Sequence, residues 1–154
     1  MAANSYLTTI ALVERLHRQC LEVIKAELDR QGIRDLSNVQ AMILFNIGTD
    51  ELTIGELTQR GYYLGSNVSY NVKKMVENGY LAQERSRHDR RAQNVRLSEK
   101  ALAVRAKLEA MYERHIGALG DELATLEGTN KQLLRLERFW NGQIGFVVRA
   151  EEAA

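Results

Sequence analysis

Residues 53–98 constrain the fold of this chain more than any other segment, because glycines divide them into short pieces with regular periodicity. The first piece begins with Thr53-x-x-Glu56, a capping-box pattern in which two side chains bond the free backbone N–H groups at a helix start. Gly61 follows, and glycine at this point indicates a helix end, since it adopts the left-handed conformation at little cost. The sequence therefore predicts a short helix over residues 53–60.

A second helix is expected over residues 65–78, between two further glycines. Its apolar side chains recur at helical spacing and predict one buried stripe, made of Val68, Val72, Met75 and Val76. The other faces carry donors and cations that suit phosphates and base edges better than a core: Ser66, Asn67, Ser69, Tyr70, Asn71, Lys73 and Lys74. Taken singly, each of these is equally compatible with an ordinary exposed helix position.

Two short strands are expected next, at 81–85 and 93–97, with the arginine-rich loop 86–92 between them. A helix-turn-helix followed by a basic hairpin predicts a winged helix, whose second helix enters the major groove of DNA while the hairpin tip reaches the minor groove. The predicted fold class is mainly α with a small β-wing, the winged helix-turn-helix covering residues 36–98. Leu52 is a candidate for a third small strand.

Residues 89–98, DRRAQNVRLS, fit the D-x-R-x(5)-L-[ST] wing signature, and on it the chain resembles the MarR family of bacterial winged-helix regulators. Residues 60–80, RGYYLGSNVSYNVKKMVENGY, further resemble its LdtR-type subgroup, which is linked to cell-wall remodelling genes. The resemblance extends over nearly the whole chain. It implies a homodimer that binds a double-stranded DNA operator and loses affinity for it when a small aromatic or phenolic effector binds.

The wing arginines are assigned by this resemblance, which implies that Arg91 reaches the minor groove and that Asp89 orients a wing arginine. A salt-bridged surface turn is the alternative. In the second helix Asn67 and Tyr70 lie one turn apart near the helix start, where base edges are read. Arg90 is the second choice for the minor-groove role, and phosphate contacts are expected from Lys73, Lys74, Arg85 and Arg87. The complete expected DNA-binding set is Ser66, Asn67, Ser69, Tyr70, Lys73, Lys74, Arg85, Arg87, Asp89, Arg90 and Arg91.

Charge is concentrated on this same segment. The whole chain has a formal net charge of +1, but residues 60–96 hold eight Lys or Arg and three Asp or Glu. A cationic patch over a helix-turn-helix is the electrostatic footprint expected of a DNA-binding surface.

Long amphipathic helices are expected on both sides of the winged helix, over residues 5–31 and 99–150. Their apolar faces are broader than one small domain needs, so a twofold-related copy is expected to cover them. We therefore expect one MarR-type domain over residues 1–154, with these segments as dimerisation helices. Within 99–150, the capping pattern Thr129-x-x-Gln132 predicts the start of a separate last helix.

Several functions are disfavoured by the sequence. His17, His88 and His115 lack metal-ligand spacing, and no nucleophile elbow, phosphate loop or acidic pair indicates an enzyme, a metal site or a cofactor. The single cysteine, Cys20, excludes an internal disulfide. No apolar run approaches the length of a membrane span, so we expect a cytoplasmic protein without a membrane partner.

The effector site is the least readable part of the sequence. The family places it between the dimerisation helices and the winged helix, where the candidate lining residues are His17, Cys20, Met42, Ile43 and Tyr112. Each is also a plausible core residue, and Cys20 is alternatively an oxidation sensor. Two rival interpretations stay open: a ligand-binding or redox-sensing protein, and a winged-helix interaction module without a DNA target.

Overall fold

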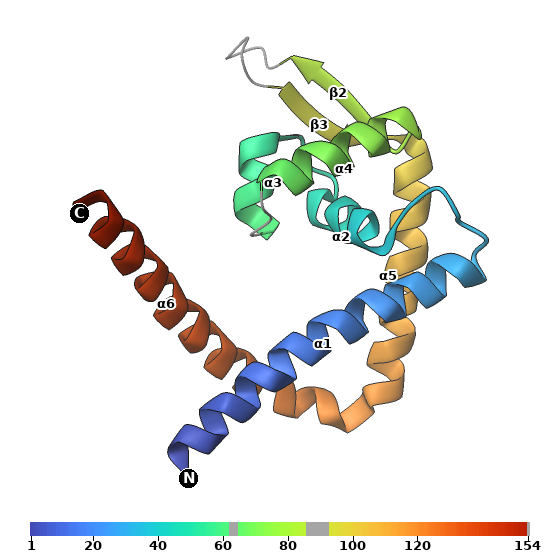
Figure 1. Ribbon diagram of the computed structural model, residues 1–154. Helices are drawn as coiled ribbons and strands as arrows, with labels where there is room; N and C mark the ends of the chain where they lie inside the picture. The colour runs from blue at the N-terminus through green and yellow to red at the C-terminus, as the bar shows by residue number, and fades with distance from the viewer. Residues whose placement is uncertain (62–64, 86–92, 154) are drawn as a thin grey trace. The chain divides into compact units, whose positions relative to one another are not determined.

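The computed structural model describes residues 1–61, 65–85 and 93–153 (Figure 1). Its contacts divide the chain into two compact units, Met1–Met111 and Tyr112–Ala154. The first unit contains helices α1 (Ala2–Arg30), α2 (Asn38–Ile47), α3 (Ile54–Gly61) and α4 (Gly65–Glu77), and the first half of α5 (Glu99–Leu119). The second contains the end of α5, a 3-10 turn at Gly120–Glu122 and α6 (Leu123–Ala153).

A three-stranded antiparallel sheet completes the first unit, in the order β1-β3-β2. Strand β2 (Leu81–Arg85) pairs with β3 (Gln93–Leu97) from Leu81 opposite Leu97 to Arg85 opposite Gln93. Strand β1 (Leu52–Thr53) adds to the other edge of β3, with Leu52 opposite Val95. The predicted winged helix is therefore confirmed, including the small third strand at Leu52.

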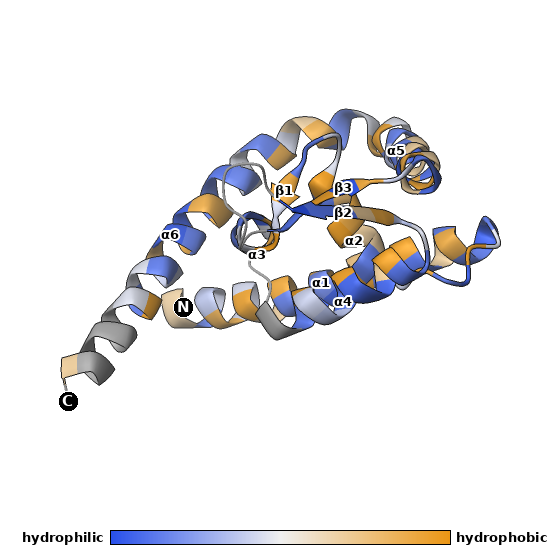
Figure 2. Cartoon of the chain, turned by 90° about the horizontal axis from the view of Figure 1, so that it is seen from above, coloured by the Kyte–Doolittle hydropathy of each residue, from blue (hydrophilic) through white to orange (hydrophobic). Residues whose placement is uncertain are grey.

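The core of the first unit forms around α2, which is largely apolar along its length (Figure 2). Ala41, Leu44 and Ile47 are completely buried there. Side chains from α3, α4, the sheet and α5 complete this core, among them Leu57, Val68, Met75, Val95, Ala101 and Leu108. Helices α3 and α4 and strand β3 thus pack on α2.

Capping boxes at Ser37 and Thr53 begin two helices, and the one at Thr53 confirms the prediction from the sequence. The Ser37 N–H donates to Gln40 Oε1 at 3.1 Å, and the Gln40 N–H donates to Ser37 Oγ at 3.1 Å. Thr53 and Glu56 exchange the corresponding bonds at 3.2 and 3.1 Å. Helix α3 then includes Gly61, one residue past the expected end.

The predicted helix start at Thr129 is wrong. Helix α6 runs unbroken from Leu123 through this position. The Thr129 hydroxyl donates to the carbonyl of Thr125 at 3.4 Å, one turn back, instead of capping a helix start. The break lies at Gly120, whose φ of +53° is the left-handed conformation that side chains other than hydrogen rarely adopt. Gly117 lies inside α5.

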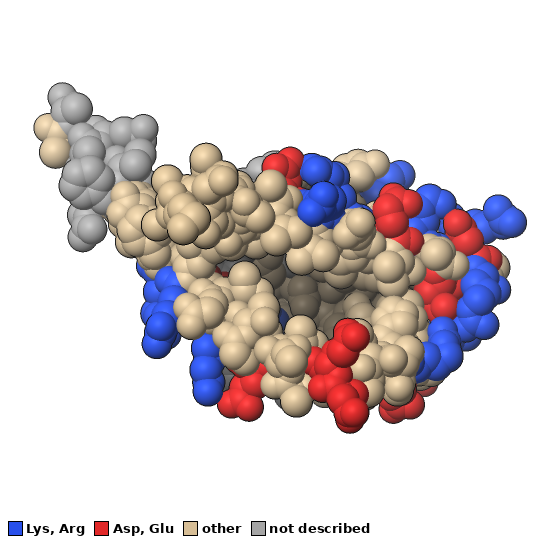
Figure 3. All heavy atoms as spheres, turned by 90° about the horizontal axis from the view of Figure 1, so that it is seen from below, with Lys and Arg blue, Asp and Glu red and all other residues tan. Residues whose placement is uncertain are grey.

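Large apolar side chains are exposed in both units. On α1, Ile24 and Leu28 are buried, whereas Leu7 and Leu16 are 63% and 57% exposed. On α6, Phe139 and Ile144 are 54% and 62% exposed. The space-filling view of Figure 3 shows broad areas without charged residues on one face of the molecule.

Candidate DNA-binding surface

Helix α4 has one buried and one exposed face, as predicted. Val68, Val72 and Met75 are 2% exposed or less, so the apolar stripe is confirmed, with Val76 half-buried beside it. The side chains of the exposed face, as far as the structure describes them, are Asn67, Ser69, Tyr70, Lys73 and Lys74. This face presents amide, hydroxyl, phenol and ammonium groups to solvent, and those groups bond to bases and phosphates.

Asn71 departs from the expected exposed set. Its side-chain oxygen accepts a hydrogen bond from Gln40 Nε2 at 3.2 Å, and its own amide donates to the Asn67 carbonyl at 2.8 Å. Gln40 is 8% exposed and also completes the capping box with Ser37. Asn71 therefore holds α4 against the start of α2, and its side-chain amide is already bonded within the protein.

The hairpin presents further charged side chains at its described residues. Arg85 ends β2 and is exposed. Arg96 pairs across the hairpin with Glu84 at 3.1 Å, and Gln83 donates to Gln93 in the same pair of strands. Of the expected DNA-binding residues, Arg87, Asp89, Arg90 and Arg91 lie outside the described residues, as does the side chain of Ser66.

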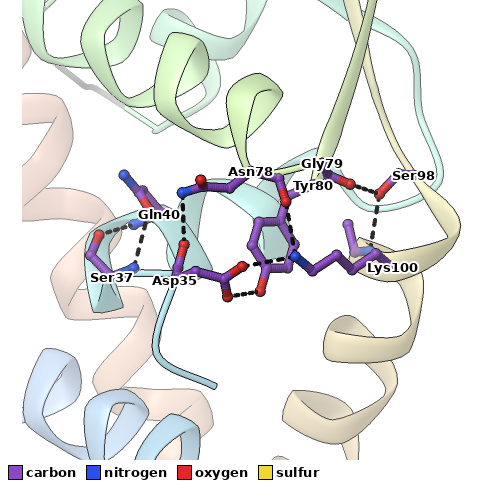
Figure 4. Close-up of polar contacts among 9 residues, drawn as sticks. Asp35, Ser37, Gln40, Asn78, Gly79, Tyr80, Ser98 and Lys100 are labelled. Atoms are coloured by element: carbon purple, nitrogen blue, oxygen red, sulfur yellow. Dashed lines mark hydrogen bonds and ion pairs between the residues drawn. The ribbon is translucent and has the colours of Figure 1, made fainter. Parts of the chain in front are cut away.

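A cluster of polar side chains lies where α4 passes into β2 (Figure 4). We call Asp35, Tyr80 and Lys100 the junction cluster. Tyr80 donates its phenolic hydrogen to Asp35 Oδ1, and Lys100 Nζ donates to Asp35 Oδ2 at 2.8 Å. The Lys100 ammonium also lies 4.2 Å from the centre of the Tyr80 ring. The three residues come from the α1–α2 loop, the residue before β2 and the first turn of α5.

The electrostatics of the cluster follow from this geometry. Hydrogen bonds from Lys100 and then from Tyr80 lower the pKa of Asp35 below its usual value. Burial, together with the Asp35 carboxylate, raises the pKa of Tyr80 above its usual value. Asp35 is therefore an ionised acceptor at neutral pH, and Tyr80 a neutral donor to it.

The residues predicted to line an effector site have varied surroundings. His17 and Cys20 are exposed on α1, Met42 is half-buried on α2, and Ile43 is 1% exposed in the core. Tyr112 belongs to the second unit, where its ring meets that of His115 edge to face at 6.1 Å between centroids.

A hollow of about 460 Å³ lies in the first unit, between the last turns of α1 and the loop that follows. None of the five candidate effector residues lines it. Its rim carries charges of both signs, from Glu22, Lys25, Asp29 and Arg34. Leu28, Ile33 and Leu36 also line the hollow, so its lining mixes charged and apolar side chains.

The described residues also bear on metal binding and on membrane insertion. No group of three or more His, Cys, Asp or Glu in that part of the chain is arranged to hold a metal ion. Among its helices, none combines the length and the apolar composition that crossing a membrane requires.

Known proteins resemble this chain in sequence and in fold. A model of the MarR family matches residues 34–92. The exopolysaccharide II synthesis transcriptional activator ExpG of Rhizobium meliloti (strain 1021) is 36% identical over 139 residues, which are 88% of this chain and 72% of ExpG.

Two solved structures show the same fold at low sequence identity. AbsC, a MarR family transcriptional regulator from Streptomyces coelicolor, has a TM-score of 0.71 and 18% identity, over 91% of this chain and 94% of AbsC. A mutant of MarR from E. coli complexed with operator DNA has a TM-score of 0.68 and 18% identity, over 85% of this chain and 96% of that one. The resemblance to the LdtR-type subgroup stays a prediction. From the family match, the identity to ExpG and the winged helix itself, this chain belongs to the MarR family of transcriptional regulators.

Proposed function

We propose that this regulator binds a pseudo-palindromic DNA operator as a homodimer, with α4 of each protomer in the major groove. The observation that carries the proposal is the division of α4 into a buried apolar stripe and an exposed face of polar and cationic side chains. Such a helix at the surface of a winged helix is suited to reading base edges. The related fold of MarR, solved in complex with operator DNA, supports the same use of this one.

Base contacts are assigned to the first turns of α4. Asn67 is exposed there and offers both a donor and an acceptor, the pair of groups that adenine matches in the major groove. Tyr70 lies one turn further along and is 62% exposed, so its phenol is free to approach a base or a phosphate. Ser66 and Ser69 complete the set near the helix start.

Phosphate contacts are assigned to the cations around this helix. Lys73 and Lys74 are exposed on α4, and Arg85 is exposed at the end of β2. For the wing, the proposal rests on the sequence signature, which places Arg91 in the minor groove with Asp89 as the residue that orients a wing arginine. Arg87 and Arg90 are the further wing candidates.

The homodimer is proposed from the exposed apolar side chains. Leu7, Leu12, Leu16 and Val23 of α1 are each at least 40% exposed, and α6 adds Leu133, Leu134, Phe139 and Ile144. Exposed apolar faces of this extent mark interaction surfaces. The apolar faces of the helices within residues 5–31 and 99–150 are therefore proposed to pack against a second copy, so that the dimer presents its two α4 helices to successive major grooves.

Control by a small aromatic or phenolic effector rests on the family resemblance, with His17, Cys20, Met42, Ile43 and Tyr112 as its candidate residues. A protein that binds operator DNA works beside the chromosome, so the proposal also places this one in the cytoplasm of a bacterial cell.

Selection from a random DNA library by the purified full-length protein tests the proposal. The expected result is enrichment of two inverted half-sites whose centres lie about one helical turn apart. Binding to the enriched sequence should weaken steeply with salt, because phosphate neutralisation releases counterions. A library that shows no enriched sequence after repeated rounds, with the protein folded throughout, would reject the proposal in favour of a winged helix without a DNA target.

A further inference from the structure

Lys100 connects three segments of the first unit through one ammonium group. Its Nζ donates to Asp35 Oδ2 at 2.8 Å and to the backbone carbonyl of Asn78 at 2.9 Å, and it lies over the Tyr80 ring. Asp35 belongs to the α1–α2 loop, and Asn78 and Tyr80 belong to the turn between α4 and β2. A single side chain in the first turn of α5 thus links the turn between α4, the proposed recognition helix, and β2 to the α1–α2 loop and to α5 (Figure 4).

Asp35 makes the complementary set of bonds. Its two carboxylate oxygens accept from Tyr80 and Lys100, and its backbone carbonyl accepts from the Asn78 side chain at 3.1 Å. The loop after α1 is therefore bonded both to the end of α4 and to α5.

Tyr80 and Ser98 extend the connection to the base of the hairpin. The Tyr80 side chain is 1% exposed, and its backbone carbonyl accepts from the Ser98 N–H at 3.0 Å. The Ser98 hydroxyl donates to the carbonyl of Gly79 at 2.6 Å, where the backbone φ is +79°. The point at which β3 passes into α5 is thus fixed against the point at which α4 passes into β2.

A small change in the angle of α4 at its C-terminal end produces a larger displacement at its first turn, where Asn67 and Tyr70 begin the proposed base contacts. Helix α4 has 13 residues, so it is about 20 Å long at 1.5 Å per residue. A tilt of about 5° at its C-terminal end would move its first turn by nearly 2 Å, more than the tolerance of a hydrogen bond to a base. The junction cluster holds the C-terminal end, while Gln40 and Asn71 hold the middle of the helix.

We propose that Asp35, Tyr80 and Lys100 are positioning residues that set the orientation of α4 and the wing on α1 and α5. In the dimer this orientation fixes the distance between the two recognition helices and hence the half-site spacing that the protein prefers. The inference rests on the proposed operator binding and adds to it the residues that determine spacing. None of the three is placed among the residues that contact DNA.

The chain offers a matched control for this role. Lys100 and Asp35 form a 2.8 Å ion pair with side chains 48% and 47% exposed. Lys25 and Asp29 on α1 form a 3.0 Å ion pair with side chains 55% and 59% exposed. Half-exposed pairs contribute little to stability, so Lys100→Met and Lys25→Met should leave the protein equally folded. Only Lys100→Met removes the bonds from the ammonium group to Asp35 and Asn78.

The experiment uses the DNA sequence enriched by the wild-type protein, together with versions that have one base pair inserted or removed between the half-sites. Affinities of wild type, Lys100→Met, Tyr80→Phe and Lys25→Met are measured by fluorescence anisotropy at constant salt, with thermal unfolding as a check of folding. Tyr80→Phe keeps the ring and removes the bond to Asp35, which gives a second variant if Lys100→Met folds poorly.

Wild type and Lys25→Met should prefer the original spacing by the same factor. In Lys100→Met and Tyr80→Phe the ratio of affinities for the original and altered spacings should fall about fivefold or more, a size typical of energetic coupling between separate sites. The ratio falls because these variants bind the original spacing less tightly and the altered spacings as before. A merely structural role would lower affinity on all three DNAs equally, and this result would overturn the inference while leaving operator binding intact. If the wild-type protein enriches no DNA, the proposed function fails and the inference fails with it.

Discussion

Gln40 donates a hydrogen bond from Nε2 to the Asn71 side-chain oxygen across 3.2 Å, and this bond joins the first turn of α2 to the middle of the recognition helix. The same side chain accepts from the Ser37 N–H through Oε1. One buried amide therefore both starts a core helix and fixes the rotation of α4 about its own axis, so that Asn67 and Tyr70 face outward.

Gln40→Glu separates these two roles. A glutamate keeps the acceptor for the capping box but replaces the donor that Asn71 needs with an oxygen. We expect the free energy of unfolding to fall by about 1–3 kcal/mol, the cost of a buried polar group left without its partner, and operator affinity to fall beyond what the folded fraction explains. Urea unfolding and anisotropy titrations on the same samples measure both.

Ser37→Ala is the control for this variant. It removes the other half of the capping box, at about 1 kcal/mol, and leaves the Gln40–Asn71 bond in place. Equal loss of operator affinity in Ser37→Ala and Gln40→Glu at matched folded fraction would contradict a positioning role for Asn71.

Asp35 should make stability depend on acid pH. Its pKa is lowered in the folded protein, so its contribution is present above the unfolded value, about 3.9, and is lost as pH falls through the folded value. The free energy of unfolding of wild type should exceed that of Asp35→Asn at pH 7 by at most about 1 kcal/mol, because the pair is half-exposed and screened.

Urea titrations followed by circular dichroism at a series of acid pH values measure this difference, which should shrink toward zero as the pH falls below 4. The same substitution at Asp29, which pairs with Lys25 at 3.0 Å on α1, shows what an ordinary surface pair contributes. A wild-type advantage that stays constant down to the lowest pH would show that the Asp35 carboxylate is not the source.

Lys73→Gln should weaken DNA binding on every sequence and should flatten its salt dependence. Removing one phosphate contact lowers the slope of log affinity against log salt by about 1. Lys131→Gln on α6 is the control, since this lysine is 68% exposed and pairs with Glu127 on the same helix. An unchanged slope in Lys73→Gln would remove this lysine from the phosphate contacts.

Leu16→Glu should dissociate the dimer. Leu16 is 57% exposed in the single chain, and a charge there would have to be buried if α1 packs against a second copy. We expect the dimer dissociation constant to rise at least about tenfold, equivalent to 1.4 kcal/mol. Sedimentation velocity over a concentration series measures it, with Arg18→Glu on the charged face of α1 as the control. Identical sedimentation of Leu16→Glu and wild type would exclude this face from the interface.

Local patterns in the sequence predicted most of the winged helix. The capping boxes at Ser37 and Thr53 and the alternation in β3 depend on residues only a few positions apart, and such signals are readable directly. The wrong prediction at Thr129 also comes from a local pattern. Thr-x-x-Gln reads the same at a helix start and inside a helix, where the hydroxyl instead bonds to a carbonyl of the preceding turn.

The junction cluster was not predictable in this way. Its bonds join Asp35 to residues 45 and 65 positions away, and no periodicity links positions that far apart. Asn71 was assigned to the exposed face for a related reason. Helical spacing places it at the edge of the apolar stripe, and only the position of Gln40 on another helix determines that its amide points inward.

Asn67→Ala is the sharpest test of whether the exposed face of α4 reads DNA sequence. Affinities of wild type and variant are measured by anisotropy for the enriched operator and for a scrambled duplex of equal length at the same salt. The variant should lose about 1–3 kcal/mol of binding free energy on the operator and nothing on the scrambled duplex, so that it no longer discriminates between the two DNAs. Equal affinities of wild type and variant for both DNAs would show that Asn67 and its face of α4 do not read the sequence.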